Sequence, residues 1–214
     1  MLREKLRLYL ITNRNRSVSE RKFLYIIEQA ILGGVTAVQL REKDLEFDQC
    51  IRLAKQCKKI TTKYKVPLFI NDNISIAKEV HAEGLHVGQS DIGLKKARQI
   101  LEKDCIIGIS INHANQLNDE QNQYADYLSI SPIFSTKTKL DITEPINLDA
   151  LSSMVKTKTK PTIAIGGITL DNVESVMKQK VDGVAVSAAI FNNDNPYKQA
   201  QRFKDIINKI TLEA

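Results

Sequence analysis

The sequence predicts one (β/α)8-barrel domain that spans residues 1–214. Eight short β-rich runs alternate with helix-like segments, the strand candidates are nearly continuous apolar runs, and no linker or shift in composition divides the chain. Strands that are apolar on both faces belong to a parallel sheet covered on both sides, and eight such units close most naturally into a barrel. An open doubly wound sheet is the alternative that this pattern leaves.

The predicted elements alternate regularly along the chain. Strands are expected at residues 6–12, 35–40, 66–70, 85–87, 105–109, 126–130, 161–165 and 183–186. Helices are expected at residues 19–32, 47–64, 74–81, 91–101, 113–123, 148–155, 170–178 and 196–210. The pair Gly33-Gly34 ends the first of these helices, because glycine readily adopts the left-handed conformation found at helix C-termini.

The charge balance suits an anionic small molecule better than nucleic acid. Lys and Arg total 31 against 25 Asp and Glu, which gives a net charge of +6, a mild excess. The basic residues are scattered, and the cluster between Lys55 and Lys65 is typical of a solvated helix face. Trp is absent and aromatic residues make up 6%, so stacking platforms for single strands are scarce. We therefore expect no nucleic-acid partner.

Cysteine usage and hydropathy indicate a cytoplasmic protein without a membrane partner. Cys50, Cys57 and Cys105 show no CxxC spacing, so neither a disulfide framework nor a zinc site is expected. Residues 1–7 are charged and unlike a signal peptide. No apolar run approaches the roughly 20 residues that cross a bilayer.

Polar residues and glycines follow the second to the eighth predicted strand, at the end where barrel active sites lie. In chain order these segments are Gln39–Lys43, Asn71-Asp72, Gly88–Asp91, Ser110, Thr136–Lys139, Gly166-Gly167 and Ser187. We expect them to surround one ligand site.

Two of these segments suit phosphate groups. Gly166-Gly167 and Ser187 follow the seventh and eighth strands, where barrels commonly bind phosphate, although a tight turn would also require the glycines. Arg41 and Lys43 are two residues apart on an extended segment and can point to the same side, towards phosphate oxygens. A solvated loop is the alternative for this second segment.

Asp72 and Asp91 are the acidic residues at two adjacent strand ends. Mg²⁺ is usually held by one or two carboxylates, substrate phosphates and water, so the pair suits a magnesium site beside a diphosphate. Because both residues precede helices, helix capping is the alternative. The histidines His81, His86 and His113 have no metal-ligand spacing; His86 can point into the barrel, and none is assigned a catalytic role.

From about Leu8 to Lys209 the chain resembles the thiamine phosphate synthase family. The resemblance rests on the order and spacing of Gln39–Lys43, Asn71-Asp72, Gly84–Gln89 before Asp91, Ala125–Tyr127, Pro132–Phe134, Thr136–Lys139, Ile165–Thr169, Asp182–Val184 and Ser187-Ala188. It implies a Mg²⁺-dependent transferase that joins a hydroxymethylpyrimidine diphosphate to a thiazole phosphate, with loss of diphosphate from the pyrimidine methylene carbon.

The resemblance also implies a role for each matching position. Arg41, Lys43, Lys139 and Ser110 would be catalytic, and Asp72 and Asp91 would hold Mg²⁺. The substrates would be bound by Gln39, Leu40, Arg41, Glu42, Lys43, Asn71, Ser110, Thr136, Lys137, Thr138, Lys139, Gly167, Val186 and Ser187. Within that set, Thr136 and Thr138 would line the thiazole side, and Gly167, Val186 and Ser187 would bind its phosphate.

Three features depart from the family pattern: Ser135 replaces a common proline, residues 141–147 lack a common glycine, and Asn112-His113 follows Ser110. The competing functions are a related thiazole tautomerase, a phosphosugar epimerase or lyase with Asp72 as its base, and a non-catalytic ligand-binding barrel. A homo-oligomer and a carboxylated thiazole substrate both remain open.

Overall fold

The computed structural model describes residues 1–14, 18–101, 103–135 and 144–212. Eight parallel strands form a closed barrel in chain order, because β1 pairs with both β2 and β8. The strands are β1 (Leu8–Ile11), β2 (Ala37–Leu40), β3 (Leu68–Asn71), β4 (Gly84–Val87), β5 (Ile106–Ile111), β6 (Tyr127–Ile130), β7 (Thr162–Ile165) and β8 (Gly183–Val186). The predicted barrel is confirmed, and the open sheet is excluded.

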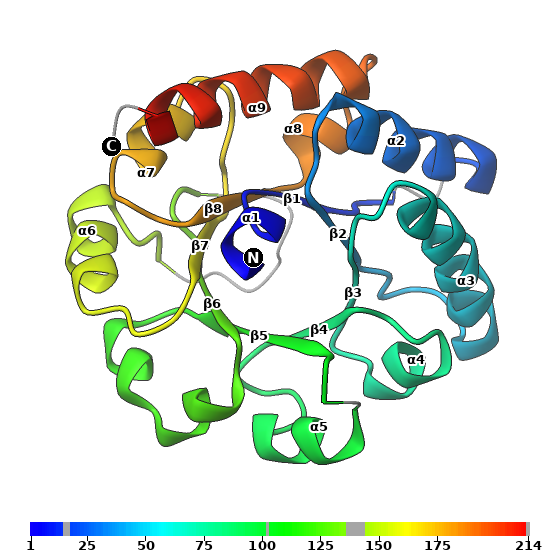
Figure 1. Ribbon diagram of the computed structural model, residues 1–214, viewed down its shortest axis with the longest axis horizontal. Coiled ribbons are helices and arrows are strands. Elements are labelled where there is room, and N and C mark those ends of the chain that lie inside the picture. Colours follow the sequence, from blue (N-terminus) through cyan, green and yellow to red (C-terminus); the bar gives the residue numbers. More distant parts are fainter. Residues whose placement is uncertain (15–17, 102, 136–143, 213–214) are drawn as a thin grey trace.

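Helices surround the barrel, and the longest ones, α2, α3 and α9, lie side by side along one part of its wall (Figure 1). The α-helices are α1 (Leu2–Lys5), α2 (Glu20–Gly33), α3 (Phe47–Lys63), α4 (Ile74–Glu79), α5 (Leu94–Ile100), α6 (Leu148–Lys156), α7 (Val173–Met177), α8 (Ala188–Phe191) and α9 (Pro196–Leu212). The 3-10 helices are η1 (Ala114–Asn118) and η2 (Glu120–Tyr124). None of the described helices is long and apolar enough to cross a membrane.

The prediction was wrong between β5 and β6, where two 3-10 turns replace the expected helix at residues 113–123. The segment is rich in Asn, Asp and Gln, whose side chains compete for backbone hydrogen bonds. Asp119 ends η1 and caps η2 by accepting a hydrogen bond from the backbone N–H of Gln121. The short helices α1 and α8 were not expected either.

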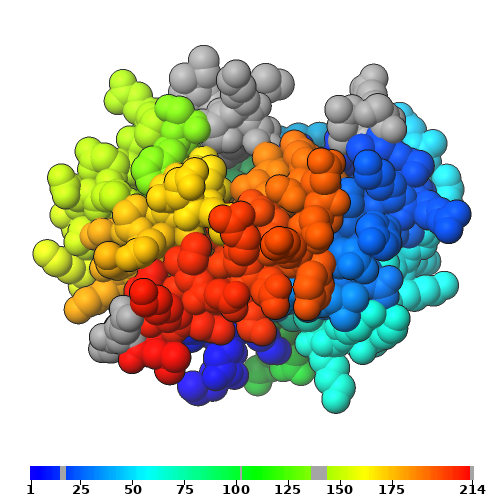
Figure 2. Space-filling view, turned by 90° about the horizontal axis from the view of Figure 1, so that it is seen from above, coloured from blue at the N-terminus to red at the C-terminus, as the bar shows by residue number. Residues whose placement is uncertain are grey.

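The barrel interior is a packed core, separate from the larger core between the strands and the helices. Tyr9, Phe69 and Tyr127 fill the interior of the barrel, and Leu6 and α1 close it at the amino ends of the strands. In side view, the N-terminal residues lie at the edge of the molecule beneath α9 (Figure 2). Gly108 leaves room for Tyr127, because a Cβ there would lie 2.1 Å from the tyrosine ring.

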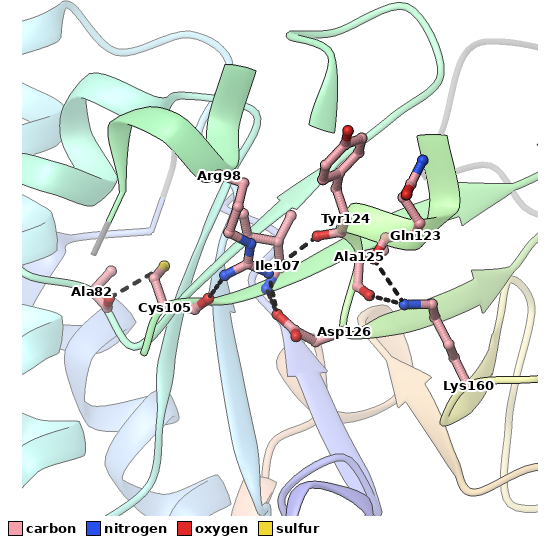
Figure 3. A network of polar contacts seen from close by, with 9 residues as sticks. All are labelled: Ala82, Arg98, Cys105, Ile107, Gln123, Tyr124, Ala125, Asp126 and Lys160. Atoms are coloured by element: carbon pink, nitrogen blue, oxygen red, sulfur yellow. Dashed lines mark hydrogen bonds and ion pairs between the residues drawn. The ribbon is translucent and has the colours of Figure 1, made fainter. Parts of the chain in front are cut away.

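A recurring contact joins each odd-numbered strand to the residue that precedes the next strand. The side chains of Thr36, Glu83 and Asp182 accept a hydrogen bond from the first backbone N–H of β1, β3 and β7, respectively. The side chain of Asp126 accepts one from the second backbone N–H of β5, that of Ile107. In the case of Asp126, the guanidinium of Arg98 also binds the carboxylate, at 2.6 Å (Figure 3). These contacts tie the amino ends of the strands together and leave the opposite ends available for a site.

Candidate functional site

At the carboxyl ends of the strands, the described residues line a cavity of about 860 Å³. Such a volume is typical of small-molecule sites. The predicted site residues that line it are Gln39, Arg41, Lys43, Asn71, Asp72, Asp91, Ser110, Gly167, Val186 and Ser187. The structure therefore gathers residues from six of the seven predicted segments around one cavity.

Leu40 and Glu42 are not brought to this cavity. Leu40 faces outward into the core between barrel and helices, and Glu42 is half-buried outside the cavity lining. Burial raises the pKa of the Glu42 carboxyl to about 7, and the Glu42 Oε1 atom has no hydrogen-bond partner among the described residues. Neither side chain is placed to contact a ligand in the cavity. Thr136, Lys137, Thr138 and Lys139 lie outside the described residues.

The two aspartates are not helix caps. Asn73 caps α4 and Gly93 precedes α5, so the capping alternative does not explain Asp72 or Asp91. Asp72 has a left-handed backbone with φ of 60°, and its N–H donates to the His86 carbonyl at 2.8 Å. Residues other than glycine seldom adopt this conformation, and aspartate is among those that tolerate it best.

The carboxyl groups of Asp72 and Asp91 lie against each other. Burial, together with a hydrogen bond to Asp91 and its negative charge, raises the pKa of Asp72 to about 6. Asp91 also accepts a hydrogen bond from the Gly88 N–H at 2.7 Å, which holds its carboxylate in place. Two adjacent carboxylates repel each other once both are ionised, so the pair suits a shared cation.

The donor set fits Mg²⁺ better than a metal that needs a protein cage. Among the described residues, no group of three or more His, Cys, Asp or Glu side chains could hold a metal ion. Mg²⁺ keeps several waters and binds through one or two carboxylates plus substrate phosphates. Asp72 and Asp91 provide that number of carboxylates at the edge of the cavity.

Arg41 and Lys43 both line the cavity beside the aspartates, as their spacing predicts. Their positive charges oppose the rise in the pKa of Asp72. The side chain of Thr12 fixes this segment: its Oγ1 accepts a hydrogen bond from the Arg41 N–H at 2.9 Å, and Thr12 is buried. Sequence reasoning missed Thr12, although it follows the first strand just as the other site residues follow theirs.

The glycine pair has a packing role as well as a place in the cavity. Gly166 and Gly167 have φ values of 102° and 63°, and a Cβ on either would lie 2.7 Å from Pro132 or Phe134. The tight-turn alternative is therefore correct for these residues, but it does not exclude a ligand, because both also line the cavity. The buried Ser187 Oγ on the same side has no hydrogen-bond partner among the described residues, which leaves it able to bind an anion.

A chain of buried polar side chains forms the floor of the cavity. The Gln39 Nε2 donates to the Tyr9 hydroxyl at 3.1 Å, and that hydroxyl lies 3.2 Å from the Tyr127 hydroxyl. The chain continues from the Tyr127 hydroxyl to the His86 Nδ1 at 2.9 Å, and from the His86 Nε2 to the Ser110 Oγ at 3.0 Å. Thus His86 does point into the barrel, and it connects two predicted site residues through tyrosines that the sequence did not single out.

Comparison with known proteins identifies close relatives. A family model described as thiamine monophosphate synthase matches residues 8–190. A thiamine-phosphate synthase of Clostridium botulinum (strain Kyoto / Type A2) is 45% identical over 188 residues, which cover 88% of this chain and 91% of the relative. One of Methanobrevibacter smithii is 43% identical over 191 residues, which cover 89% and 90%.

Solved structures include a member of the same family and more distant barrels. A thiamine phosphate pyrophosphorylase from Pyrococcus furiosus has a TM-score of 0.89 and 30% identity, with 98% of this chain and 99% of that chain covered. A 3-hexulose-6-phosphate synthase has a TM-score of 0.67 but only 13% identity, over 94% and 99% of the two chains. The latter shares the fold alone.

Proposed function

The chain belongs to the thiamine monophosphate synthase family, and we propose that its cavity binds a pyrimidine diphosphate and a thiazole phosphate side by side, with Mg²⁺ on the diphosphate. The synthesis of thiamine phosphate, a transferase reaction of thiamine biosynthesis, is the activity of the chain. The metal and the residue roles are the part that we infer. The supporting observation is that the aspartate pair and the basic pair line the same cavity as the glycine turn.

Opposite sides of the cavity suit the two anionic groups. Arg41, Lys43 and Asn71 surround the aspartate pair at the ends of β2 and β3, and would bind the diphosphate. Gly167, Val186 and Ser187 lie at the ends of β7 and β8, and would bind the thiazole phosphate. Gln39 and Ser110 lie between them on the floor, where the pyrimidine ring would rest. This arrangement brings the two reacting rings together in a confined site.

Asp72 and Asp91 would hold Mg²⁺, which when bound supplies positive charge that neutralises phosphate oxygens. Arg41 and Lys43 stabilise the negative charge that grows on the diphosphate as it leaves the pyrimidine methylene carbon. The amino-substituted ring stabilises the resulting cation, which the thiazole nitrogen attacks. No protein nucleophile or proton-abstracting base is needed, and the floor only has to orient the ring and exclude water.

An assay with purified protein, both substrates and Mg²⁺ tests the reaction and the metal together. We expect thiamine phosphate and diphosphate in equal amounts, and a loss of turnover with EDTA that Mg²⁺ restores. Turnover that EDTA leaves unchanged would rule out the metal. Thiazole tautomerase turnover without thiamine phosphate would favour the related isomerase, and ligand binding without turnover, measured by calorimetry, would favour a non-catalytic barrel.

Residues 136–139 are tested separately, because the proposal gives Thr136 and Thr138 to the thiazole side and Lys139 to the diphosphate. Replacing Lys139 by Ala should weaken binding of the diphosphate group, which would be seen as a higher KM for the pyrimidine diphosphate. Kinetics identical to those of the parent protein would show that this segment has been misassigned.

A further inference from the structure

The hydrogen-bond chain on the cavity floor runs from Gln39 on β2 to Ser110 on β5, across the interior of the barrel. Its middle members, Tyr9 and Tyr127, are completely buried, and His86 is 8% exposed. Burial raises the pKa of both tyrosines above the usual phenol range, so both remain protonated at neutral pH. Each tyrosine therefore has one hydrogen to donate.

The amide donor at Gln39 sets one consistent direction for the chain when each tyrosine hydroxyl donates its hydrogen to the next member. The Tyr9 oxygen accepts from the Gln39 amide, so its own hydrogen is available for the Tyr127 oxygen. The Tyr127 hydrogen is then available for the His86 Nδ1. With Nδ1 as an acceptor, the proton of a neutral imidazole lies on Nε2 and is donated to the Ser110 Oγ.

Both ends of the chain then present a defined group to the cavity. At Gln39 the amide nitrogen donates to the Tyr9 hydroxyl, and the amide oxygen accepts no hydrogen bond from the described residues. At Ser110 the oxygen accepts from His86, which leaves the hydroxyl hydrogen to donate. The backbone carbonyl of Ser110 accepts a second hydrogen bond, from the Gln89 Nε2 at 2.6 Å, which holds Ser110 in place.

We propose that Tyr9, Tyr127 and His86 are positioning residues that couple the hydrogen-bonding direction of Gln39 to that of Ser110, so that the floor offers one acceptor and one donor to the aminopyrimidine ring. An amino group donates and a ring nitrogen accepts, so the ring matches this pair. Reversing the chain would require the Gln39 amide to turn over and would exchange the acceptor and the donor together. The inference rests on the proposed function, which puts the ring on Gln39 and Ser110.

Replacing Tyr127 by Phe removes the hydroxyl at the centre of the chain and keeps the ring. The dissociation constants of the pyrimidine diphosphate and of inorganic diphosphate, each with Mg²⁺, are then measured by calorimetry. We expect the first to rise about tenfold and the second to stay unchanged, because only the ring contacts the floor. The KM for the thiazole phosphate should also stay unchanged. An unchanged ratio of the two dissociation constants overturns the inference.

Phe69→Leu is the matched control, because Phe69 packs edge-on against Tyr127 at 88° in the same core and has no hydroxyl. It should lower the unfolding temperature while leaving the ratio of the two dissociation constants unchanged. A purely structural role for Tyr127 would make the two variants alike. If wild-type protein binds neither diphosphate, the proposed function has failed, and the second measurement decides the inference.

The second measurement needs no ligand, and its decisive result comes from the wild-type protein. ¹⁵N NMR of histidine-labelled wild-type protein, with His86 assigned by comparison with His86→Asn, reports which ring nitrogen carries the proton. We expect the proton on Nε2, and in Tyr127→Phe a shift towards the other tautomer. A proton on Nδ1 in the wild-type protein would mean that the chain runs in the opposite direction, and the proposal would be wrong.

Discussion

The acidic side chains at the two ends of the barrel lie in opposite environments. At the amino ends of the strands, the Asp182 carboxylate lies 2.7 Å from the Lys158 ammonium and 3.4 Å from the Arg3 guanidinium, and accepts from the Thr162 N–H. At the carboxyl ends, Asp72 and Asp91 lie against each other, and the pKa of Asp72 is raised. The first carboxylate lies beside two basic side chains, whereas in the second arrangement one carboxyl group lies against another, which disfavours ionisation of Asp72.

This difference in environment distinguishes acidic residues that stabilise the fold from acidic residues that are placed to bind a ligand. The amino-end contacts repeat around the barrel, with a neutral Thr36 at β1 and charged side chains at β3, β5 and β7. The three acidic members each also bind a basic side chain, from Lys58, Arg98 or Lys158. At the other end, the positive charges of Arg41 and Lys43 only partly oppose the rise in the pKa of Asp72, and a bound cation would supply the remaining balance.

The largest expected effect is on turnover, from removing either carboxylate of the carboxyl-end pair. Asp72→Ala and Asp91→Ala should each lower kcat about 100-fold or more, because the charge on the departing diphosphate is no longer neutralised. The unfolding temperature without metal should not fall, since each change removes like-charge repulsion. Steady-state kinetics over a Mg²⁺ titration, with thermal unfolding of the same samples, tests this. Normal rates with unchanged Mg²⁺ dependence in both variants would exclude the assigned role.

Asp182→Ala should produce the reverse pattern at the amino end. The Asp182 side chain is 9% exposed and Lys158 is 18% exposed, so the change leaves a largely buried ammonium and a backbone N–H without their acceptor. We expect a loss of about 3 kcal/mol in unfolding free energy, with kcat unchanged. Thr36→Val is the matched control in the neutral contact and should cost about 1 kcal/mol. Urea unfolding with both variants measures the difference; equal losses would show that the charge adds nothing.

The sequence predicted the barrel and most of the cavity because both depend on local patterns. Continuous apolar strands define a parallel barrel, and the residue after each strand necessarily lies at one end of it. Arg41, Lys43, Asp72 and Asp91 were found by this rule, and Thr12 was missed because the predicted first strand, residues 6–12, included it, whereas β1 ends at Ile11.

The floor and the amino-end contacts could not be predicted in this way. Tyr9 and Tyr127 lie inside apolar strands and are 118 residues apart, so nothing local reveals that their hydroxyl groups meet. Likewise, nothing local reveals that Arg98, on the helix between β4 and β5, reaches Asp126, which precedes β6. Such contacts follow from the closure of the barrel. Leu40 and Glu42, in contrast, were expected at the site on the family resemblance, and their side chains do not line the cavity.

The smallest effect is a pH dependence of stability that belongs to the carboxyl end alone. The pKa of Asp72 is about 6 in the folded protein, above its ordinary value of 3.8, so the folded state binds this proton more tightly than the unfolded state. Stability therefore decreases as pH rises from about 4 to about 6 and stays lower above that range. Asp72→Asn removes this loss.

Without metal, the unfolding temperature of Asp72→Asn should exceed that of the wild type at pH 7.5 and equal it near pH 4. Asp205→Asn, at an exposed position on α9, is the control for removing a surface charge and should show no such crossover. Mg²⁺ should raise the wild-type unfolding temperature at pH 7.5 more than near pH 4, because the proton and the metal compete for the same carboxylates. If the unfolding temperatures of variant and wild type differed by the same amount at every pH in this range, the raised pKa of Asp72 would not affect stability. The two ends of the barrel would then differ only in their basic side chains.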